Sequence, residues 1–199
     1  ARLRRALPWL LAAAAMAAGA AGFQWMRARP ADPGWTASSF LTSESAADVE
    51  PAMTPDGKTV AFTRRSGGAS RVWLLDVKTG TQALLTRDGP GEAALPLLAD
   101  ERSPAWNPAD GTVYFVADHK GLPAVWRAPR WPGSSPALVI GDAEEPAVSP
   151  DGTTLAFVRP NAAGSDRIWV ASLPGATDAR AVTGDGPEFG LWEHREPAW

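Results

Sequence analysis

The chain of 199 residues contains no cysteine, only two histidines and only one tyrosine. The absence of cysteine excludes the disulfide framework of a small secreted domain and every zinc site built on cysteine. Two histidines are too few for a zinc site built on histidine alone. The chain also lacks an excess of positive charge: 19 Lys and Arg stand against 22 Asp and Glu, for a net charge of −3. That balance argues against a basic nucleic-acid-binding domain.

Glycine, proline and tryptophan are abundant instead. The sequence has 19 Gly, 19 Pro and ten Trp, and 45% of its residues are hydrophobic. So many hydrophobic residues argue against disorder. The high proline content argues against long helices and predicts many short elements joined by turns. The length is sufficient for one domain with a sizeable core.

The N-terminal segment differs from the rest. Residues 6–23 carry no charge, and they are flanked by Arg on both sides, with Trp25 just beyond. As a helix they would span roughly 27 Å, close to the roughly 30 Å hydrocarbon core of a bilayer. We therefore expect residues 1–29 to be a transmembrane anchor with its N-terminus in the cytoplasm, or a signal peptide with a small-residue end at residues 18–20. A buried Ala-rich helix is a third interpretation.

Charge and composition change after this segment. Residues 1–29 contain five Arg and no acid, so the remaining chain carries a net charge of −8. Such an acidic region is not expected to contact nucleic acid. Residues 30–34 read Pro-Ala-Asp-Pro-Gly, which is typical of a linker. We assign the linker to residues 30–40 and a second domain to residues 41–199.

The second domain is an internal repeat. A Pro-Ala dipeptide followed by a turn motif starts at residues 50–57, 103–111 and 145–152, and a fourth copy begins at residues 196–199. The intervals between the repeated prolines are 53, 42 and 51 residues. A fixed motif at such intervals is typical of repeat architectures.

Each copy predicts four short strands joined by three turns. After the Pro-Ala strand comes an Asp-Gly turn and a second strand at residues 59–63, 112–116 and 154–158. A polar loop follows, then a Trp-centred strand at residues 72–74, 125–127 and 168–170, and a closing strand at residues 84–86, 138–140 and 181–183. Four strands in about 40 residues indicate one blade of a β-propeller. Asp-Gly supplies the positive φ that a tight turn needs, and Pro suits the start of the first strand.

The fold class expected is therefore all-β, a propeller of four-stranded blades preceded by one transmembrane or signal helix. The blades are predicted at about residues 48–88, 102–142 and 143–185, with the start of the next at 195–199. Closed propellers use about four to eight blades. We therefore expect an incomplete ring and a chain that is a fragment. The long first interval holds an insertion, residues 88–101, which we expect to be a rim loop.

At residues 145–157 the repeat resembles the TolB-type propeller family, whose blades open with Pro-Ala-x-Ser-Pro-Asp-Gly and continue into an apolar strand ending near Phe. The first copy departs from this pattern with Thr54, and the second with Asn107 and the extra Ala109. The resemblance covers residues 41–199 and implies the fold, without carrying over any catalytic residue. In relatives of this layout the propeller often follows a single span, behind a cytoplasmic winged-helix or Ser/Thr kinase domain. The resemblance therefore implies the sensory part of a signalling protein.

The search for chemistry finds no Gly-x-Ser-x-Gly elbow, no phosphate-binding loop and no His-Glu-x-x-His. We assign no catalytic, cofactor-binding or metal residue. His119 and His194, and the acidic pairs Glu144–Glu145 and Glu188–Glu193, are interpreted as surface residues. Three repeat-equivalent turn acids are interpreted as turn-formers, and three repeat-equivalent tryptophans as core residues: Asp56, Asp110 and Asp151, then Trp73, Trp126 and Trp169.

Candidates for partner binding are Trp131 and Trp192, which break the repeat, and Arg64 and Arg65, expected in a solvated loop after the first turn. Exposed aromatics often anchor a partner. We expect a non-catalytic, envelope-facing module that binds a protein, peptide or small ligand at the propeller rim, without a cofactor. Residues 6–25 would tether it to the bacterial inner membrane.

Two alternatives remain open. The first is the propeller of a prolyl oligopeptidase-type serine peptidase, with every catalytic residue beyond Trp199. The second is a periplasmic TolB-like scaffold whose signal is cleaved.

Overall fold

A computed structural model describes residues 38–86, 100–160, 164–184 and 197–199. Leu41–Trp199 forms one compact unit. The predicted anchor or signal segment, and the linker up to residue 37, lie outside the described residues. In the described ranges, no helix is long and apolar enough to cross a membrane.

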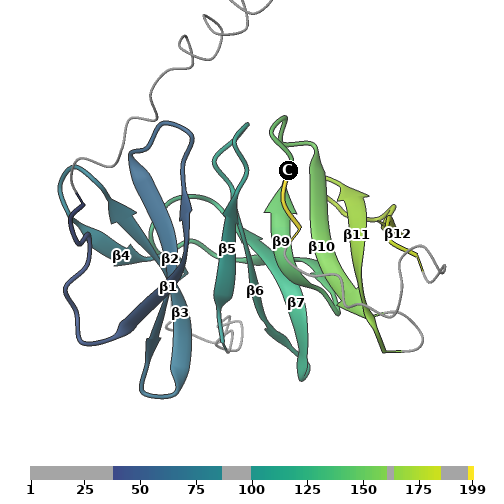
Figure 1. Ribbon diagram of the computed structural model, residues 1–199, viewed down its shortest axis with the longest axis horizontal. Coiled ribbons are helices and arrows are strands. Elements are labelled where there is room, and N and C mark those ends of the chain that lie inside the picture. The colour runs from purple at the N-terminus through teal and green to yellow at the C-terminus, as the bar shows by residue number, and fades with distance from the viewer. Residues whose placement is uncertain (1–37, 87–99, 161–163, 185–196) are drawn as a thin grey trace, which may run out of the picture. The chain divides into compact units, whose positions relative to one another are not determined.

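The described residues form three four-stranded antiparallel sheets, each built from strands consecutive in sequence (Figure 1). The first sheet contains β1 (Ala47–Met53), β2 (Thr59–Ser66), β3 (Ala69–Asp76) and β4 (Gln82–Leu84). The second contains β5 (Arg102–Trp106), β6 (Val113–His119), β7 (Leu122–Ala128) and β8 (Ala137–Gly141). The third contains β9 (Glu144–Val148), β10 (Thr154–Pro160), β11 (Asp166–Ser172) and β12 (Arg180–Ala181). We call these sheets blades 1, 2 and 3.

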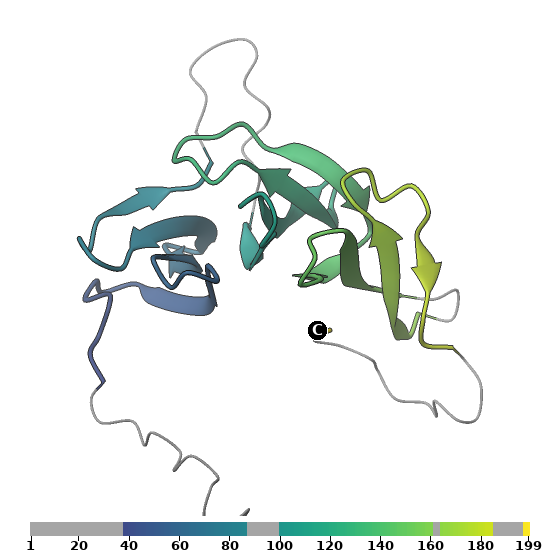
Figure 2. The same cartoon turned by 90° about the horizontal axis from the view of Figure 1, so that it is seen from above.

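The three blades follow one another in chain order and lie side by side (Figure 2). Their first strands contact one another, β1 with β5 and β5 with β9. Four strands per repeat and stacked repeats are the arrangement predicted from the sequence. The fourth strand of blade 1 lies two residues earlier than expected, at residues 82–84. The Leu85 N–H still donates to the Val72 carbonyl of β3, but the Leu85 carbonyl and Thr86 bond toward blade 2.

The connection between β2 and β3 differs from the predicted polar loop. Strand β2 continues through Arg64 and Arg65 to Ser66, and the turn consists of Gly67 and Gly68. Both glycines have positive φ, 62° and 82°. A two-residue turn of this kind matches the twist of the paired strands and needs glycine or asparagine. The short, regular hairpin therefore replaces the loop.

Each first strand carries a bulge at its proline motif. The residues before the three prolines, Glu50, Ser103 and Glu145, have φ of 53°, 51° and 50°. The pairing register shifts at the same place in β1, β5 and β9. The predicted position of Pro at the start of the strand is therefore wrong by a few residues. Proline is compatible with the bulge because it has no N–H group, so no hydrogen bond of the strand ladder is lost there.

Of the three hydrophobic clusters in the described residues, two lie between blades, and the third lies within blade 1 around Phe62. One cluster joins Val72 and Leu85 of blade 1 to Trp106, Phe115 and Trp126 of blade 2. A second cluster joins blade 2 to blade 3 and includes fully buried tyrosine, leucine and phenylalanine side chains: Tyr114, Leu155 and Phe157. Of the three repeat-equivalent tryptophans, Trp126 is buried, whereas Trp73 and Trp169 are half-buried and pack against core residues.

Successive blades are also joined by one repeated hydrogen bond. Trp106 Nε1 donates to the carbonyl of Ala52 at 2.8 Å, from the second Pro-Ala motif to the first. Trp199 Nε1 donates to the carbonyl of Ala147 at 3.1 Å, from the fourth Pro-Ala motif to the third. We call this contact the indole bond. In blade 3 the equivalent residue is Val148, which has no such donor.

A buried carboxylate joins the outer part of blade 1 to the start of blade 2. Glu101 is 1% exposed. It accepts hydrogen bonds from the Val72 N–H at 2.9 Å and from the Thr86 hydroxyl, and it lies 3.3 Å from Arg71 Nε. Thr86 and Glu101 also flank residues 87–99, which contain most of the predicted insertion and lie outside the described residues. Thr86 and Glu101, on either side of this segment, are thus hydrogen-bonded to each other.

The indole bond predicts different outcomes for two tryptophan variants. Trp106→Phe removes the indole N–H, so the Ala52 carbonyl loses this hydrogen bond. Trp169→Phe removes an Nε1 that is buried with no hydrogen-bond partner in the described structure. Both variants lose the same indole volume. We therefore expect Trp106→Phe to lower the free energy of unfolding by about 1–2 kcal/mol more than Trp169→Phe. Chemical denaturation measures this difference, and equal losses would contradict the role of the bond.

Glu101 provides a second stability prediction. Glu101→Ala leaves Arg71 without its carboxylate and two donors without an acceptor, so we expect a loss of about 3–5 kcal/mol. Glu101→Gln keeps one of the two acceptor oxygens and should lose clearly less. Denaturant midpoints of the two variants test the order. A glutamine variant as unstable as the alanine variant would assign the whole effect to charge.

Candidate functional site

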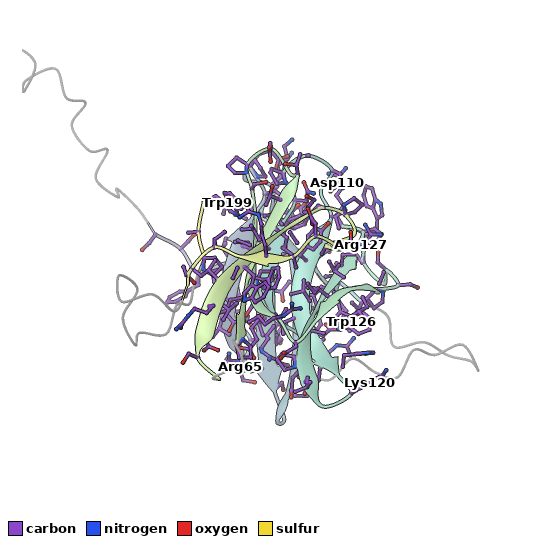
Figure 3. All side chains as sticks on the ribbon, turned by 90° about the vertical axis from the view of Figure 1, so that its right-hand side faces the viewer. Arg65, Asp110, Lys120, Trp126, Arg127 and Trp199 are labelled. Carbon is purple, nitrogen blue, oxygen red and sulfur yellow. The ribbon has the colours of Figure 1, made fainter. Side chains whose placement is uncertain are left out.

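The unit has two rims, defined by its connections. The hairpin rim carries the β2–β3 and β6–β7 hairpins, and the turn rim carries the Asp-Gly turns. In Figure 3, Arg65 and Lys120 lie toward the hairpin rim and Asp110 lies toward the opposite end. Candidate surfaces are found on both rims.

On the turn rim, the aspartates of the repeated motif hold the turns, as predicted. Asp56 Oδ1 accepts from the Thr54 hydroxyl at 2.7 Å and from the Lys58 N–H at 3.1 Å. These bonds lower the pKa of Asp56 to about 2, the Thr54 hydroxyl contributing most. Asp151 repeats the arrangement with Ser149 and Thr153. Asp110 accepts from the Thr112 N–H at 2.8 Å.

The turn rim also carries an exposed tryptophan on an anchored loop. Trp131 is 62% exposed and lies in residues 129–136, between β7 and β8, which we call the Trp131 loop. The loop is bonded to the outer strand region of blade 1: Gly133 N–H donates to the Leu84 carbonyl at 3.1 Å, and Ser134 N–H donates to the Leu85 carbonyl at 2.9 Å. Ser134 Oγ also donates to the Trp131 carbonyl at 2.5 Å. The backbone that carries the Trp131 side chain thus belongs to blade 2 and is hydrogen-bonded to blade 1.

Arg130 accompanies Trp131. Its guanidinium carbon lies 4.7 Å from the centre of the Trp131 ring. A Cβ added at Gly111 would lie 3.0 Å from Arg130 Cδ, so the arginine chain passes directly over that glycine. Arg130 has no hydrogen bond or ion pair within the residues that the structure describes. It borders a groove of about 390 Å³ whose other walls include Pro55, Trp106 and Pro108.

A larger groove of about 650 Å³ lies on the hairpin rim, between blades 1 and 2. We call it the hairpin groove. Blade 1 contributes the end of β2, the glycine turn and the start of β3, and blade 2 contributes the approach to β5 and the end of β6. Its charged lining residues are Arg65, Asp100, Arg102 and Asp118.

Both arginines of the hairpin groove are paired with glutamates of first strands. Arg65 Nη2 donates to Glu50 Oε1 at 3.1 Å, and Arg102 Nη2 donates to Glu144 Oε1 at 3.3 Å. Glu50 is fixed in turn by the Thr63 hydroxyl at 2.9 Å and by the Ser103 N–H of blade 2 at 2.7 Å. The groove walls are therefore held by bonds that cross the blade boundary.

Arg64 does not lie in a solvated loop, and this expectation is wrong. It is 9% exposed and makes a two-point contact with Asp48, at 2.7 and 2.8 Å. Its guanidinium also lies over the Phe62 and Trp73 rings, at 5.2 and 4.8 Å. The hydrogen bonds from Arg64 lower the pKa of Asp48. Arg64 is engaged inside blade 1, which leaves Arg65 as the accessible member of the pair.

Sequence reasoning missed that Arg64 has a repeat equivalent. Arg159 lies over Phe157 and Trp169, at 5.3 Å from each ring centre. Burial lowers the pKa of Arg159, and the negative charge of Asp142 opposes this shift. The guanidinium donates to the Asp142 and Gly141 carbonyls at 2.9 and 2.6 Å. The sequence signal for this equivalence is an Arg two residues after the Phe of the second strand, which occurs in blades 1 and 3. In blade 2 that position is Ala117.

The remaining candidates are dispersed. His119, at the end of β6, packs edge-on against Trp126, with ring centres 5.6 Å apart. Glu144 and Glu145 lie in β9. Trp192, His194, Glu188 and Glu193 fall outside the described residues. Within the described ranges, no three His, Asp or Glu side chains gather as a metal site would require.

Comparison with known proteins finds no matching family model and no matching curated relative. Solved structures do match. TolB from Acinetobacter baumannii superposes with a TM-score of 0.59 at 22% identity, over 78% of this chain and 37% of that one. The chain has a TolB-like β-propeller fold.

Two further structures agree. A putative TolB from Agrobacterium tumefaciens has a TM-score of 0.58 at 20% identity, over 72% of this chain and 51% of that one. A structure of a nidogen/laminin complex has a TM-score of 0.60 at 16% identity, over 79% of this chain and 56% of that one. The present chain thus spans between about a third and just over half of these structures. At these identities the likeness establishes the fold alone, and the peptidase alternative stays a prediction.

The burial of the tryptophans predicts which of them are structural. Trp131→Ala removes a side chain that is largely in water, so the free energy of unfolding should change by no more than about 1 kcal/mol, including the stacked arginine. Trp126→Ala empties a core position that is 6% exposed and should cost about 3–5 kcal/mol. Thermal and denaturant unfolding of the two variants tests the contrast. A large loss in Trp131→Ala would assign that residue to the fold.

Proposed function

We propose that this chain is a non-catalytic, envelope-facing propeller module of a membrane-tethered bacterial protein, and that it binds a protein or peptide partner at its turn rim. The observation that carries the proposal is the Trp131 loop, in which an exposed tryptophan is held by backbone hydrogen bonds to the neighbouring blade. Holding an anchor residue in its bound position reduces the entropy lost on association.

The chemistry of this surface suits a protein partner. Tryptophan and arginine are the residue types most often found at energetic centres of interfaces. Here they are stacked on each other, and the in-plane N–H groups of a stacked guanidinium stay available to an acceptor. The adjacent groove adds proline and tryptophan side chains, next to the carboxylates of Asp56 and Asp110. A segment that offers backbone carbonyl groups to the guanidinium and an apolar side chain to the tryptophan would match this surface.

The Arg-flanked apolar segment at residues 6–23 supports the tethered location. The sequence resemblance implies the same layout, in which a propeller outside the membrane follows a single transmembrane span. In such relatives the propeller is the sensory part of a signalling or regulatory protein. We include that role in the proposal.

Site-specific photo-crosslinking in a bacterial envelope tests the binding surface. A photoreactive residue at position 131 of the full chain should give a discrete crosslinked product, and Arg130→Ala should reduce it several-fold. The matched control is position 78, where Lys78 is exposed on the same rim of blade 1. Equal crosslinking from positions 131 and 78, or a product unaffected by Arg130→Ala, would refute a specific surface at the Trp131 loop.

A further inference from the structure

Arg130 joins the Trp131 loop to the groove between the Asp-Gly turns of blades 1 and 2. Its guanidinium carbon lies 4.7 Å from the centre of the Trp131 ring, and its side chain borders the groove beside Pro55 and Pro108. Trp131, Arg130 and this groove therefore form one continuous surface on the turn rim, which we call the Arg130 surface.

The charges of the Arg130 surface balance. The groove is lined by the carboxylates of Asp56 and Asp110 as well as by Arg130, and Lys58 lies 3.3 Å from Asp56. Two carboxylates and two cations leave no net charge that would attract an acidic or a basic guest. The guanidinium itself has N–H donors and no acceptor. A neutral carbonyl oxygen is therefore the group that this surface can bind.

The guest must then carry backbone carbonyls that its own fold leaves unbonded. A helix bonds its carbonyls internally, except in its last turn. Polyproline II is extended, makes no internal hydrogen bonds and leaves every carbonyl accessible. An extended segment in this conformation therefore matches a surface whose polar group is a donor.

Pairing of the guest as an added strand does not fit the Trp131 loop. Strand addition needs a row of unpaired backbone N–H groups on the receiving chain. In this loop the N–H groups of Gly133 and Ser134 already donate to carbonyls of blade 1. Three of the eight loop residues are prolines, which have no N–H: Pro129, Pro132 and Pro136. Recognition here must therefore use side chains.

The side chains present are those that suit proline rings. Proline-rich segments in polyproline II conformation dock in grooves lined by aromatic residues. Trp131 keeps most of its surface in water although Arg130 stacks on it, and its backbone is held by blade 1. A proline ring on the indole leaves no N–H unbonded, and a preformed polyproline II segment loses little entropy on binding.

We infer that the Arg130 surface binds a proline-rich segment in polyproline II conformation, with a proline ring against Trp131 and a backbone carbonyl bonded to the Arg130 guanidinium. This inference rests on the proposed function and specifies the chemistry of the partner. Crosslinking from position 131 detects a partner of any sequence, so a proline-specific assay can fail while the proposed function stands.

The test uses the full chain in a non-ionic detergent and two rhodamine-labelled, end-capped peptides of equal length, Gly-Pro-Pro-Pro-Pro-Pro-Gly and Gly-Ser-Gly-Ser-Gly-Ser-Gly. Both offer neutral carbonyls, but only the first is held in polyproline II. Fluorescence anisotropy should show saturable binding of the proline peptide and at least tenfold weaker binding of the serine peptide. Because the recognised groups of the peptide are uncharged, added salt should change the affinity less than twofold.

Two variants remove the proposed contacts, and two matched controls remove the same residue types elsewhere. Trp131→Ala and Arg130→Ala should each weaken binding of the proline peptide at least fivefold. Trp199→Ala removes a tryptophan that is 58% exposed, and Arg180→Ala removes an exposed arginine of blade 3. Each control should change binding less than twofold. All variants are compared well below their unfolding midpoints, so that differences in stability do not affect the result.

The inference is wrong if the unmodified chain does not bind the proline peptide or binds both peptides equally. It is also wrong if the controls lose as much binding as Trp131→Ala and Arg130→Ala, since the peptide would then bind elsewhere. A crosslinked product from position 131 without binding of the proline peptide would show that the partner is not proline-rich and would leave the proposed function intact. Absence of both would overturn both.

Discussion

Burial between blades is the constraint on which the rest of this structure depends. A four-stranded sheet of this size has two faces to cover, and neither face can be covered by the sheet itself. The two larger described clusters accordingly mix residues of neighbouring blades, with Val72 and Leu85 of blade 1 against Phe115 and Trp126 of blade 2. Each blade is thus stable only as the neighbour of another, and the polar bonds between blades determine how the neighbours are aligned.

Those polar bonds are concentrated near the first strands. At the bulge of β5, the backbone N–H of Ser103 donates to Glu50 of blade 1. The indole bond joins the same two strands further along, between Trp106 of β5 and Ala52 of β1. Glu101 also joins blade 2 to blade 1, farther from the first strands. Its buried carboxylate accepts hydrogen bonds from β3 and from the residue pair after β4. Together these contacts hold blade 2 against blade 1 at three separate places along the blade boundary.

The candidate surfaces are consequences of this alignment. The Trp131 loop is rigid because its backbone bonds to blade 1, and the hairpin groove exists because the β2–β3 hairpin of blade 1 stands beside the start of β5. Both surfaces are made by two blades, so neither would survive in an isolated repeat. Their chemistry also differs, with an arginine over an aromatic ring on one rim and a mixed set of arginines and aspartates on the other.

The sequence by itself determined the blade architecture. The Pro-Ala motif, the Asp-Gly turn and the Trp-centred strand recur at fixed distances, and each is a local signal whose backbone preference needs no distant partner. It also indicated that Trp131 was unlike the repeat-equivalent tryptophans. The environments of individual side chains depended on the tertiary structure. Arg64 and Arg65 are adjacent in one strand, yet alternation places Arg64 over Phe62 and Trp73 and leaves Arg65 at the groove. The same holds for Glu101, whose partners lie 15 and 29 residues away. Only the stacking of one blade on the next brings those groups together.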